Sequence, residues 1–547
     1  MPMDCSLREA VLAANADPDS DAILLPAGHF RLTIPGPGVD ATEGDLNLAE
    51  DVTITGVGAR LTVIDAQGLD RVFDIAIGIT AEIDDVTVTG GQTSFDGAGI
   101  SSAGTLTLLR DTVSANSAGG HGGGISSLYA LSVEQSTISA NRAASGGGGI
   151  VFGGTALVRD STLVGNVAGG AGSDGSGGAI ERPGAGALVL SSSTLTDNRS
   201  YNPIAAGGGL ELLDATVDNS IVANNVAYLN DQSLGALSNC GGAVTSGGHN
   251  LSDGTDCGFT QPGDQEGVPV LLGPLADNGG PTDTEAVLPG SLALDAGAGC
   301  AATDQRSVSR PRGNACEVGA YEFAPPLVTT TAATSIGFTT ATMTGSVDPS
   351  LRETTAWFEY GRTTEYGSTT PVRYVGAGNG QMSFTEPLTG LRQGATYHYR
   401  LVAANAEGRT VGPDQSFSTM DRAKPVLGNL RVVPGLFHRK NGATFAFTLS
   451  ENATVTLRFD RVLRGVRKGR RCVKITRRNR RRRPCARYLP VSGSIAQTAA
   501  EGPNSIHWDA KVGTTLLKFG AYRLRATPRD AAGNVGKTAL AAFRVLR

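Results

Sequence analysis

The sequence predicts an all-β protein: a right-handed parallel β-helix followed by two β-sandwich domains. Three observations predict the β-helix. A motif recurs at a first spacing of 25 residues between positions 97 and 225, apolar residues alternate with Thr and Ser inside each copy, and Gly and Asn interrupt the chain every few residues. A period of this length corresponds to one repeating unit of a solenoid. The alternation indicates strands, and the Gly content disfavours helical repeats.

The motif is six residues long and ends in Asn. Because equivalent positions of successive coils stack about 4.8 Å apart, matching side chains should form columns. We expect a ladder of amides at one corner, formed by Asn116, Asn141, Asn166 and Asn198, since Asn tolerates the backbone of such turns. An apolar column is expected at Val113, Ile138, Leu163 and Leu195. The five copies lie at 111–116, 136–141, 161–166, 193–198 and 219–224.

A short amphipathic helix is predicted over residues 5–15. Ser6 and Glu9 have the spacing of a capping box, and Leu7 and Val11 share one apolar face. A helix placed there would close the open end of the solenoid core. The predicted domains are a capping helix at 1–20, the β-helix at 21–323, and sandwiches at 324–420 and 421–547.

Six of the seven cysteines fall into three local pairs, which predicts disulfides and therefore an extracellular or cell-surface protein. Cys5 is left over, and the first residues lack the regions of a secretory signal. We therefore expect the natural chain to begin further upstream, with its export signal there. No apolar run is long enough to span a bilayer, and no zinc motif occurs. The expected disulfides are Cys240–Cys257, Cys300–Cys316 and Cys472–Cys485.

The β-helix region resembles a family of bacterial exported proteins. The letters CSLREA at 5–10 are similar to the motif that opens this family. The distal segments 275–282, 288–291, 294–297, 304–306 and 316–322 resemble the choice-of-anchor Q domain. The resemblance implies a secreted or surface-exposed bacterial β-helix protein with no assigned reaction.

The two predicted sandwiches carry weaker resemblances. Residues 324–420 resemble a fibronectin type III module, chiefly through 390–401, and Trp357 and Tyr397 are expected in its core. Residues 421–547 resemble a bacterial Ig-like domain that closes on a turn at 530–534. Such modules imply a spacer and a binding domain.

Charge is divided unevenly along the chain. Residues 421–547 hold 28 Lys and Arg against six Asp and Glu, whereas the whole chain has 46 and 51. Fourteen of these basic residues lie in 461–487, which has no acid. We expect this segment, the cationic finger, to be a disulfide-closed hairpin. Its expected polyanion-binding residues are Arg464, Arg467, Lys468, Arg470, Arg471, Lys474, Arg477, Arg478, Arg480, Arg481, Arg482 and Arg483.

The expected partners of the cationic finger are polyanions outside the cell, such as cell-wall polymers, matrix polymers and acidic polysaccharides. Guanidinium groups bind carboxylates and phosphates bidentately, and such binding weakens with salt. No dedicated nucleic-acid site is expected, because the segment has no aromatic residue before Tyr488 on which bases would stack. The alternative is a solvated loop whose charge serves solubility.

A second hypothesis is a glycoside hydrolase or lyase acting on acidic polysaccharides. Its catalytic candidates are Asp84, Asp85 and His121, which are similar to part of the polygalacturonase signature. The flanking Asn-Thr-Asp and Arg-Ile-Lys of that signature are missing. The glycines on either side of His121 are better explained by the glycine cluster that recurs in each coil than by a catalytic motif. Lyase chemistry would need Ca²⁺. The nearest acids and base for it are Asp65, Asp70, Asp74 and Arg71.

The sequence thus favours a modular exported protein that binds rather than catalyses. The β-helix would be a rigid platform, the fibronectin-like module a spacer and the basic domain the part that binds anionic polymers. No cofactor and no metal are expected for this function. A purely structural cell-envelope protein is a third hypothesis.

Overall fold

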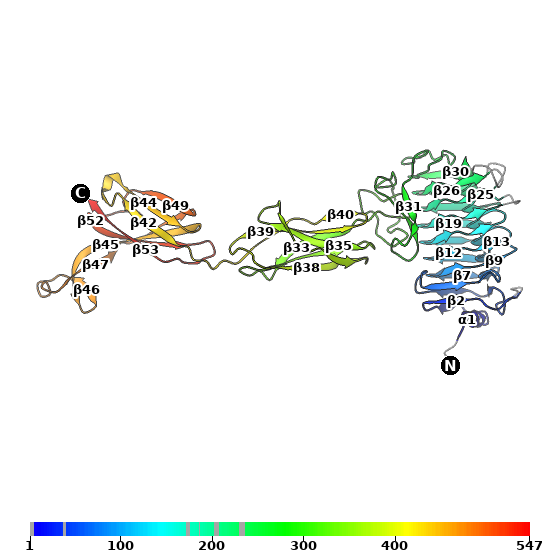
Figure 1. Cartoon of the computed structure of the whole chain (residues 1–547), viewed down its shortest axis with the longest axis horizontal. Helices are drawn as coiled ribbons and strands as arrows, with labels where there is room; N and C mark the ends of the chain where they lie inside the picture. Colours follow the sequence, from blue (N-terminus) through cyan, green and yellow to red (C-terminus); the bar gives the residue numbers. More distant parts are fainter. Residues whose placement is uncertain (1–4, 37–39, 171–174, 185, 202–206, 229–235) are drawn as a thin grey trace.

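The computed structural model describes residues 5–36, 40–170, 175–184, 186–201, 207–228 and 236–547. A parallel β-solenoid is followed by two domains of antiparallel sheets, which confirms the predicted fold class. Figure 1 shows the coils stacked along one axis, with the two antiparallel domains in line to one side of the stack.

Each complete coil contributes four short strands, and equivalent strands of successive coils pair in parallel. The pairing keeps the 25-residue period, since Leu106 pairs with Leu131 and Val113 pairs with Ile138. The first row contains β1 (Asp21–Leu24), β4 (Val52–Thr55), β7 (Thr80–Asp84), β11 (Thr105–Leu109), β15 (Leu131–Glu134), β19 (Thr155–Arg159) and β23 (Ala187–Ser191). The second contains β3 (Leu46–Leu48), β6 (Phe73–Ile75), β10 (Ile100–Ser102), β14 (Ile125–Ser127), β18 (Ile150–Phe152) and β22 (Ile180–Glu181).

Two further rows complete the coils, and longer strands end the stack. The third row contains β2 (Gly28–Arg31), β5 (Thr62–Asp65), β8 (Thr87–Thr89), β12 (Thr112–Ser114), β16 (Thr137–Ser139), β20 (Thr162–Val164), β24 (Thr194–Thr196) and β27 (Ile221–Ala223). The fourth contains β9 (Gln92–Thr93), β13 (Ser117–Ala118), β17 (Arg142–Ala143), β21 (Val167–Ala168), β25 (Arg199–Tyr201) and β28 (Val226–Tyr228), with β29 (Ala236–Leu237) antiparallel to β28. The first two rows meet in β26 (Leu210–Asp218), which pairs with β30 (Cys240–Gly248).

The apolar column predicted from the repeat is part of the solenoid core. Val113, Ile138, Leu163 and Leu195 are completely buried, and they belong to one cluster that runs through the coils. Each buried side chain is covered by its equivalents in the coils above and below. The removal of apolar area from water therefore stabilises neighbouring coils together.

A ladder of buried Asn side chains runs along one corner of the solenoid, as predicted. The Nδ2 of each Asn donates to the Oδ1 of the next at 2.9–3.0 Å. These side chains are at most 1% exposed. The amides therefore satisfy one another and the backbone of the turn in a place that water does not reach. The predicted members are Asn116, Asn141, Asn166 and Asn198.

The fifth copy of the motif differs from the prediction by one residue. The ladder continues to Asn225 rather than to Asn224, so the fifth copy is 220–225. The pairing of β27 is the reason, because Ile221 pairs with Thr194 and carries Asn225 into the ladder position. Asn occurs at both 224 and 225, so the sequence alone placed this copy one residue too early.

A column of hydroxyl groups, not predicted from the sequence, runs along another corner. Each Ser Oγ accepts a hydrogen bond from the backbone N–H of the equivalent residue one coil earlier, at 3.0–3.2 Å. The recurring Ser at the start of the motif therefore satisfies corner amides. The acceptors are Ser136, Ser161, Ser193 and Ser220.

Helix α1 (Leu7–Ala14) closes the first coil, which confirms the predicted helix. The capping box of Ser6 and Glu9 is formed, and Leu7 and Val11 are buried against the core. The guanidinium of Arg8 donates to three backbone carbonyls in the segment 41–45, which fixes the helix on the solenoid. Free Cys5 is exposed beside the helix.

The segment after β30 folds back along the side of the solenoid. Its hairpin is β31 (Leu272–Ala276) and β32 (Thr284–Val287). Gln305 accepts from the hydroxyl of Thr162 at 2.7 Å and donates to that of Thr137 at 3.0 Å. The outward hydroxyls of the third row therefore hold this segment in place.

The first antiparallel domain, called the first sandwich, has two sheets around a core that includes Phe358 and Tyr399. Tyr397 is buried, as predicted, while Trp357 is only half-buried and lies 5.8 Å from the Arg409 guanidinium. One sheet contains β33 (Leu327–Thr334), β34 (Ala341–Asp348) and β38 (Met382–Leu388). The other contains β35 (Thr354–Gly361), β36 (Ser368–Thr369), β37 (Arg373–Gly376), β39 (Thr396–Asn405), β40 (Gly408–Val411) and β41 (Gln415–Ser418).

A buried polar network joins the solenoid to the first sandwich. The hydroxyl of Tyr321 donates to Glu407, and Arg352 donates to Glu407 at 2.7 Å and to the Tyr321 hydroxyl at 2.8 Å. The guanidinium of Arg306 lies 3.6 Å from the centre of the Tyr321 ring. Burial raises the pKa of Tyr321, which stays a neutral donor to Glu407.

The second antiparallel domain, called the second sandwich, packs around Trp508, Phe445 and Phe459. One sheet contains β42 (Leu427–Val433), β44 (Ala443–Leu449) and β49 (Gly502–Trp508). The other contains β43 (Leu436–His438), β45 (Ala453–Lys468), β46 (Arg471–Lys474), β47 (Pro484–Pro490), β48 (Ile495–Ala499), β52 (Gly520–Arg529) and β53 (Ala539–Leu546). A 3₁₀ turn at Arg439–Asn441 and the hairpin of β50 (Lys511–Val512) and β51 (Thr515–Leu516) complete it.

Candidate functional site

The cationic finger is an extension of one strand of the second sandwich. The first part of β45 pairs with β52 inside the domain, from Thr454 to Val462. The rest continues beyond β52 and pairs with β46 on one side and β47 on the other. Figure 1 shows this three-stranded ribbon projecting from the sandwich, on the side away from the solenoid.

A disulfide joins the two outer strands of the ribbon. Cys472 and Cys485 are bonded, with their Cα atoms 6.0 Å apart. The bond lies against Gly465 of the central strand, where an added Cβ would stand 2.6 Å from the Cys472 sulfur. Because glycine has no side chain, the disulfide can form at this position. The other two predicted pairs, Cys240–Cys257 and Cys300–Cys316, are also bonded.

All twelve predicted basic residues of the finger are exposed, and none forms an ion pair with any carboxylate in the described ranges. The carboxylate at the base of the finger is Asp460, which already pairs with Arg523 at 2.7 Å and Arg525 at 3.3 Å. The positive charge of the finger is therefore not compensated internally. Like charges held close together attract a polyanion strongly and release its counterions.

We expect Gly465→Ala to impair closure of the Cys472–Cys485 disulfide. The new methyl group would overlap the Cys472 sulfur, so thiol labelling without reductant should find free thiol at both cysteines. Gly435→Ala is the matched control, because an added Cβ there meets a single carbonyl oxygen at 3.8 Å. Complete disulfide formation in Gly465→Ala, by peptide mass analysis, would contradict this reading of the strand.

The structure does not bring the hydrolase candidates together. Asp84 and Asp85 lie at the turn between β7 and β8, whereas His121 lies in the loop between β13 and β14, at another corner of the coil. Asp85 is held by a two-pronged ion pair with Arg110, whose Nη2 is 2.6 Å away. The ring of His121 contacts Glu181 at 2.8 Å.

The ionisation of these groups has local causes. Burial, with a smaller effect of the Glu82 carboxylate, raises the pKa of Asp84 to about 6. The hydrogen bond to Glu181 raises the pKa of His121. The two therefore titrate in separate environments rather than as an acid–base pair.

The lyase candidates also have structural partners. Asp65 accepts from the backbone of Gln67 at 2.8 Å and contacts His29 at 3.1 Å, and Asp70 accepts from the backbone of Arg71. The side chain of Arg71 donates to a backbone carbonyl of the next coil. These acids organise turns, and within the described residues they do not form a group with metal-ligand spacing.

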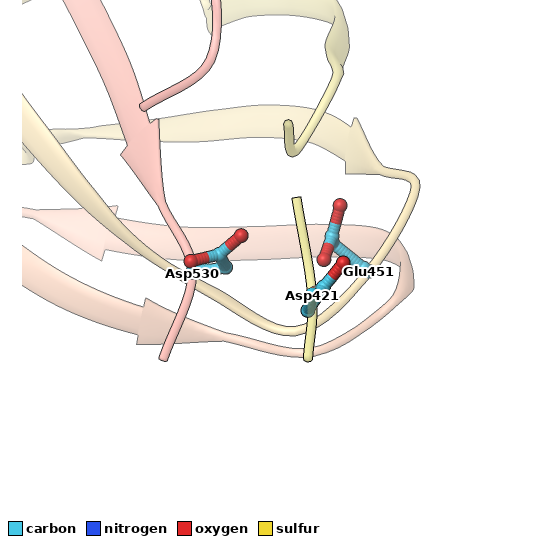
Figure 2. A group of neighbouring side chains, drawn as sticks. All are labelled: Asp421, Glu451 and Asp530. Atoms are coloured by element: carbon cyan, nitrogen blue, oxygen red, sulfur yellow. The ribbon is translucent and has the colours of Figure 1, made fainter. Parts of the chain in front are cut away.

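Among the described residues one group has such spacing, and it was not predicted from the sequence; it lies where the second sandwich begins. Figure 2 shows Asp421, Glu451 and Asp530, whose ligand oxygens all lie within 4.8 Å of one another. They come from the segment before β42, the turn after β44 and the end of β52. Partial burial, then the neighbouring carboxylates, raise the pKa of Glu451. Asp530 is already bound by the backbone and side chain of Asn534, at 2.7 and 2.9 Å.

No protein-family model matches the chain, and no curated protein matches it. Among solved structures, the sensor domain of the anti-sigma factor RsgI4 of Pseudobacteroides cellulosolvens is 14% identical; the match covers 18% of this chain and 98% of that one, with a TM-score of 0.15. The chicken CNTN1 FN1-FN3 domains are 11% identical over 41% of this chain and 66% of that one, with a TM-score of 0.19. Within the described ranges, no helix has the length and apolar character needed to cross a bilayer.

Proposed function

We propose that this protein is an extracellular or cell-surface modular protein that binds anionic polymers through its cationic finger and acts without catalysis or a cofactor. The β-solenoid would be the platform, the first sandwich a fibronectin-like spacer and the second an Ig-like binding domain. The resemblance to bacterial CSLREA and choice-of-anchor Q proteins supports export, as do three disulfides in the structure.

The observation that carries the proposal is the finger itself. Twelve exposed basic side chains lie on a disulfide-closed ribbon, with no carboxylate of the described chain to neutralise them. A loop that served solubility alone would not need the Cys472–Cys485 disulfide, nor a glycine at 465 that leaves room for it. The disulfide reduces the conformational entropy that the ribbon would lose on binding.

The test is salt-dependent binding of the full chain to heparin. We expect affinity to fall about 1000-fold between 50 and 200 mM salt, as for a protein that makes six or more such contacts. The variant R480Q/R481Q/R482Q/R483Q should bind more weakly, and the slope of log affinity against log salt should decrease by about one for each lost contact. Titration by fluorescence anisotropy measures both quantities.

The matched control removes four exposed charges elsewhere, in R31Q/R199Q/R362Q/K424Q. It lowers the net charge equally but leaves the finger intact. If the control and the finger variant lose affinity to the same extent, binding follows net charge and the proposed role of the finger is wrong.

A further inference from the structure

A depression of about 970 Å³ lies at the base of the finger, in the second sandwich. One wall is the 3₁₀ turn that carries Arg439 and Lys440, and the other is the β50–β51 hairpin with Lys511 and Leu516. Phe519, just before β52, also lines the depression. The depression is therefore built from three segments that the sandwich brings together.

The walls of the depression are held by the core of the domain. The indole of Trp508, which is buried, donates to the carbonyl of Lys511 at 2.6 Å. Leu517, 2% exposed, anchors the other end of the hairpin, and its backbone donates to Ala510 at 3.0 Å. A ligand would meet a surface that is already in place, which reduces the entropy lost on binding.

The side chains of the depression combine positive charge with exposed apolar surface. Leu516 is 42% exposed and Phe519 is 38% exposed. The guanidinium of Arg439 lies 4.0 Å from the centre of the Phe519 ring, and neither Arg439 nor Lys440 is paired with an acid in the described chain. Lys511 forms an exposed ion pair with Asp509 at 3.3 Å, and the Asp509 carboxylate is also a hydrogen-bond acceptor.

The depression lies near the point where β45 leaves β52 to form the finger. Arg461 of β45 pairs across the sheet with Leu489 of β47 and Tyr522 of β52. Its guanidinium donates to the carbonyl of Phe519 at 3.1 Å. A linear polyanion that lies along the finger would therefore reach the depression through Arg461.

We propose that this depression is a subsite for one acidic sugar unit of a polysaccharide, an inference that rests on the proposed function of the finger. Arg439, Lys440 and Lys511 would bind the carboxylate, and Leu516 and Phe519 would contact the apolar C–H face of the ring. Asp509 would accept a hydrogen bond from a ring hydroxyl. This combination of anion, apolar face and hydroxyl donors is that of a uronic acid, whereas an inorganic polyphosphate offers the charge alone.

The test uses the full chain with two probes, tetragalacturonate and inorganic polyphosphate, titrated by calorimetry. The variant K440Q/K511Q should lower the affinity for tetragalacturonate about tenfold, since two exposed ion pairs with the ligand are lost. K440Q/K511Q should lower the affinity for polyphosphate less than R481Q/R482Q does, although R481Q/R482Q removes the same number of positive charges, from the finger. Leu516→Ala should weaken tetragalacturonate binding and leave polyphosphate binding unchanged.

Each alternative outcome is distinct. If polyphosphate binds but tetragalacturonate does not, or if both double variants weaken both probes equally, the subsite is overturned while the function of the finger stands. If a short single-stranded DNA displaces tetragalacturonate and responds to Leu516→Ala, the depression takes nucleotides and the proposal is wrong. If neither probe binds at 50 mM salt, the proposed function fails as well.

Discussion

We expect Asn166→Ala to destabilise the centre of the solenoid by about 4 kcal/mol. The side chain has no exposed surface. Its Oδ1 accepts from the backbone and from the Nδ2 of Asn141, at 3.1 and 3.0 Å, and its Nδ2 donates to the carbonyl of Ile138 at 2.9 Å. Truncation removes these hydrogen bonds from a place that water does not reach, and each buried group left unsatisfied costs about 1–3 kcal/mol.

Hydrogen–deuterium exchange of the full chain measures this effect in one coil. Since 1.4 kcal/mol is a factor of ten, backbone amides near residues 138–166 should exchange roughly 1000-fold faster. Asn224→Ala is the matched control, because Asn224 is exposed and its position is occupied by Ala115 and Ala140 in other coils, with nearly the same φ. Equal protection in the two variants would show that the ladder contributes no stability.

We expect the solenoid to lose stability as pH rises from about 4 to 7, with Asp45 as one cause. Asp45 is completely buried, and neither carboxylate oxygen has a hydrogen-bond partner among the described residues. Burial, together with the carboxylates of Asp70 and Asp74, raises its pKa to about 7, although Arg71 opposes this shift from 3.6 Å.

The direction follows from the raised pKa. The folded state holds the Asp45 proton up to about pH 7, whereas the unfolded chain releases it near pH 4. Stability is therefore complete below pH 4 and decreases until the folded state also ionises. Between pH 5 and pH 8 this group alone should cost about 3 kcal/mol.

Asp45→Asn should remove this part of the pH dependence. We expect the difference in solenoid Tm between pH 5 and pH 8, by calorimetry, to be about 8 °C smaller than in the unsubstituted chain. Asp160 and Glu285, whose pKa values burial also raises to about 7, would keep the remaining slope. Asp19→Asn, the same change at an exposed position, should leave the slope unchanged. Equal slopes in Asp45→Asn and Asp19→Asn would contradict the assignment.

Much of the solenoid could be predicted because its contacts repeat along the chain. In the middle coils each residue meets its equivalent 25 positions away, as in Val113 and Ile138, so that the period of the letters is also the period of the contacts. The register failed at the fifth copy, where both Asn224 and Asn225 match the letter and only the pairing of β27 distinguishes them. Where a coil contains an insertion, the sequence alone does not determine which residues of neighbouring coils are equivalent.

The finger was predictable for a different reason. Its charge and its two cysteines lie within one short segment, which predicts a cationic, disulfide-closed hairpin. The structure shows a ribbon of three strands instead of two. The structure added what the letters do not specify, namely that β45 extends beyond its sheet and that Gly465 makes room for the disulfide. The local segment contains the charges, but the neighbouring strand sets where they project.

The sequence by itself determined the β class, the coil period, the capping helix and the position of the cationic segment, because each depends on contacts that are local or periodic. Only the tertiary structure separated Asp84 and Asp85 from His121, joined Tyr321 to Glu407, and brought Phe519, Lys440 and Lys511 around one depression. These relations join single residues that lie tens of positions apart. No period repeats them, so the packing of whole domains decides which side chains meet.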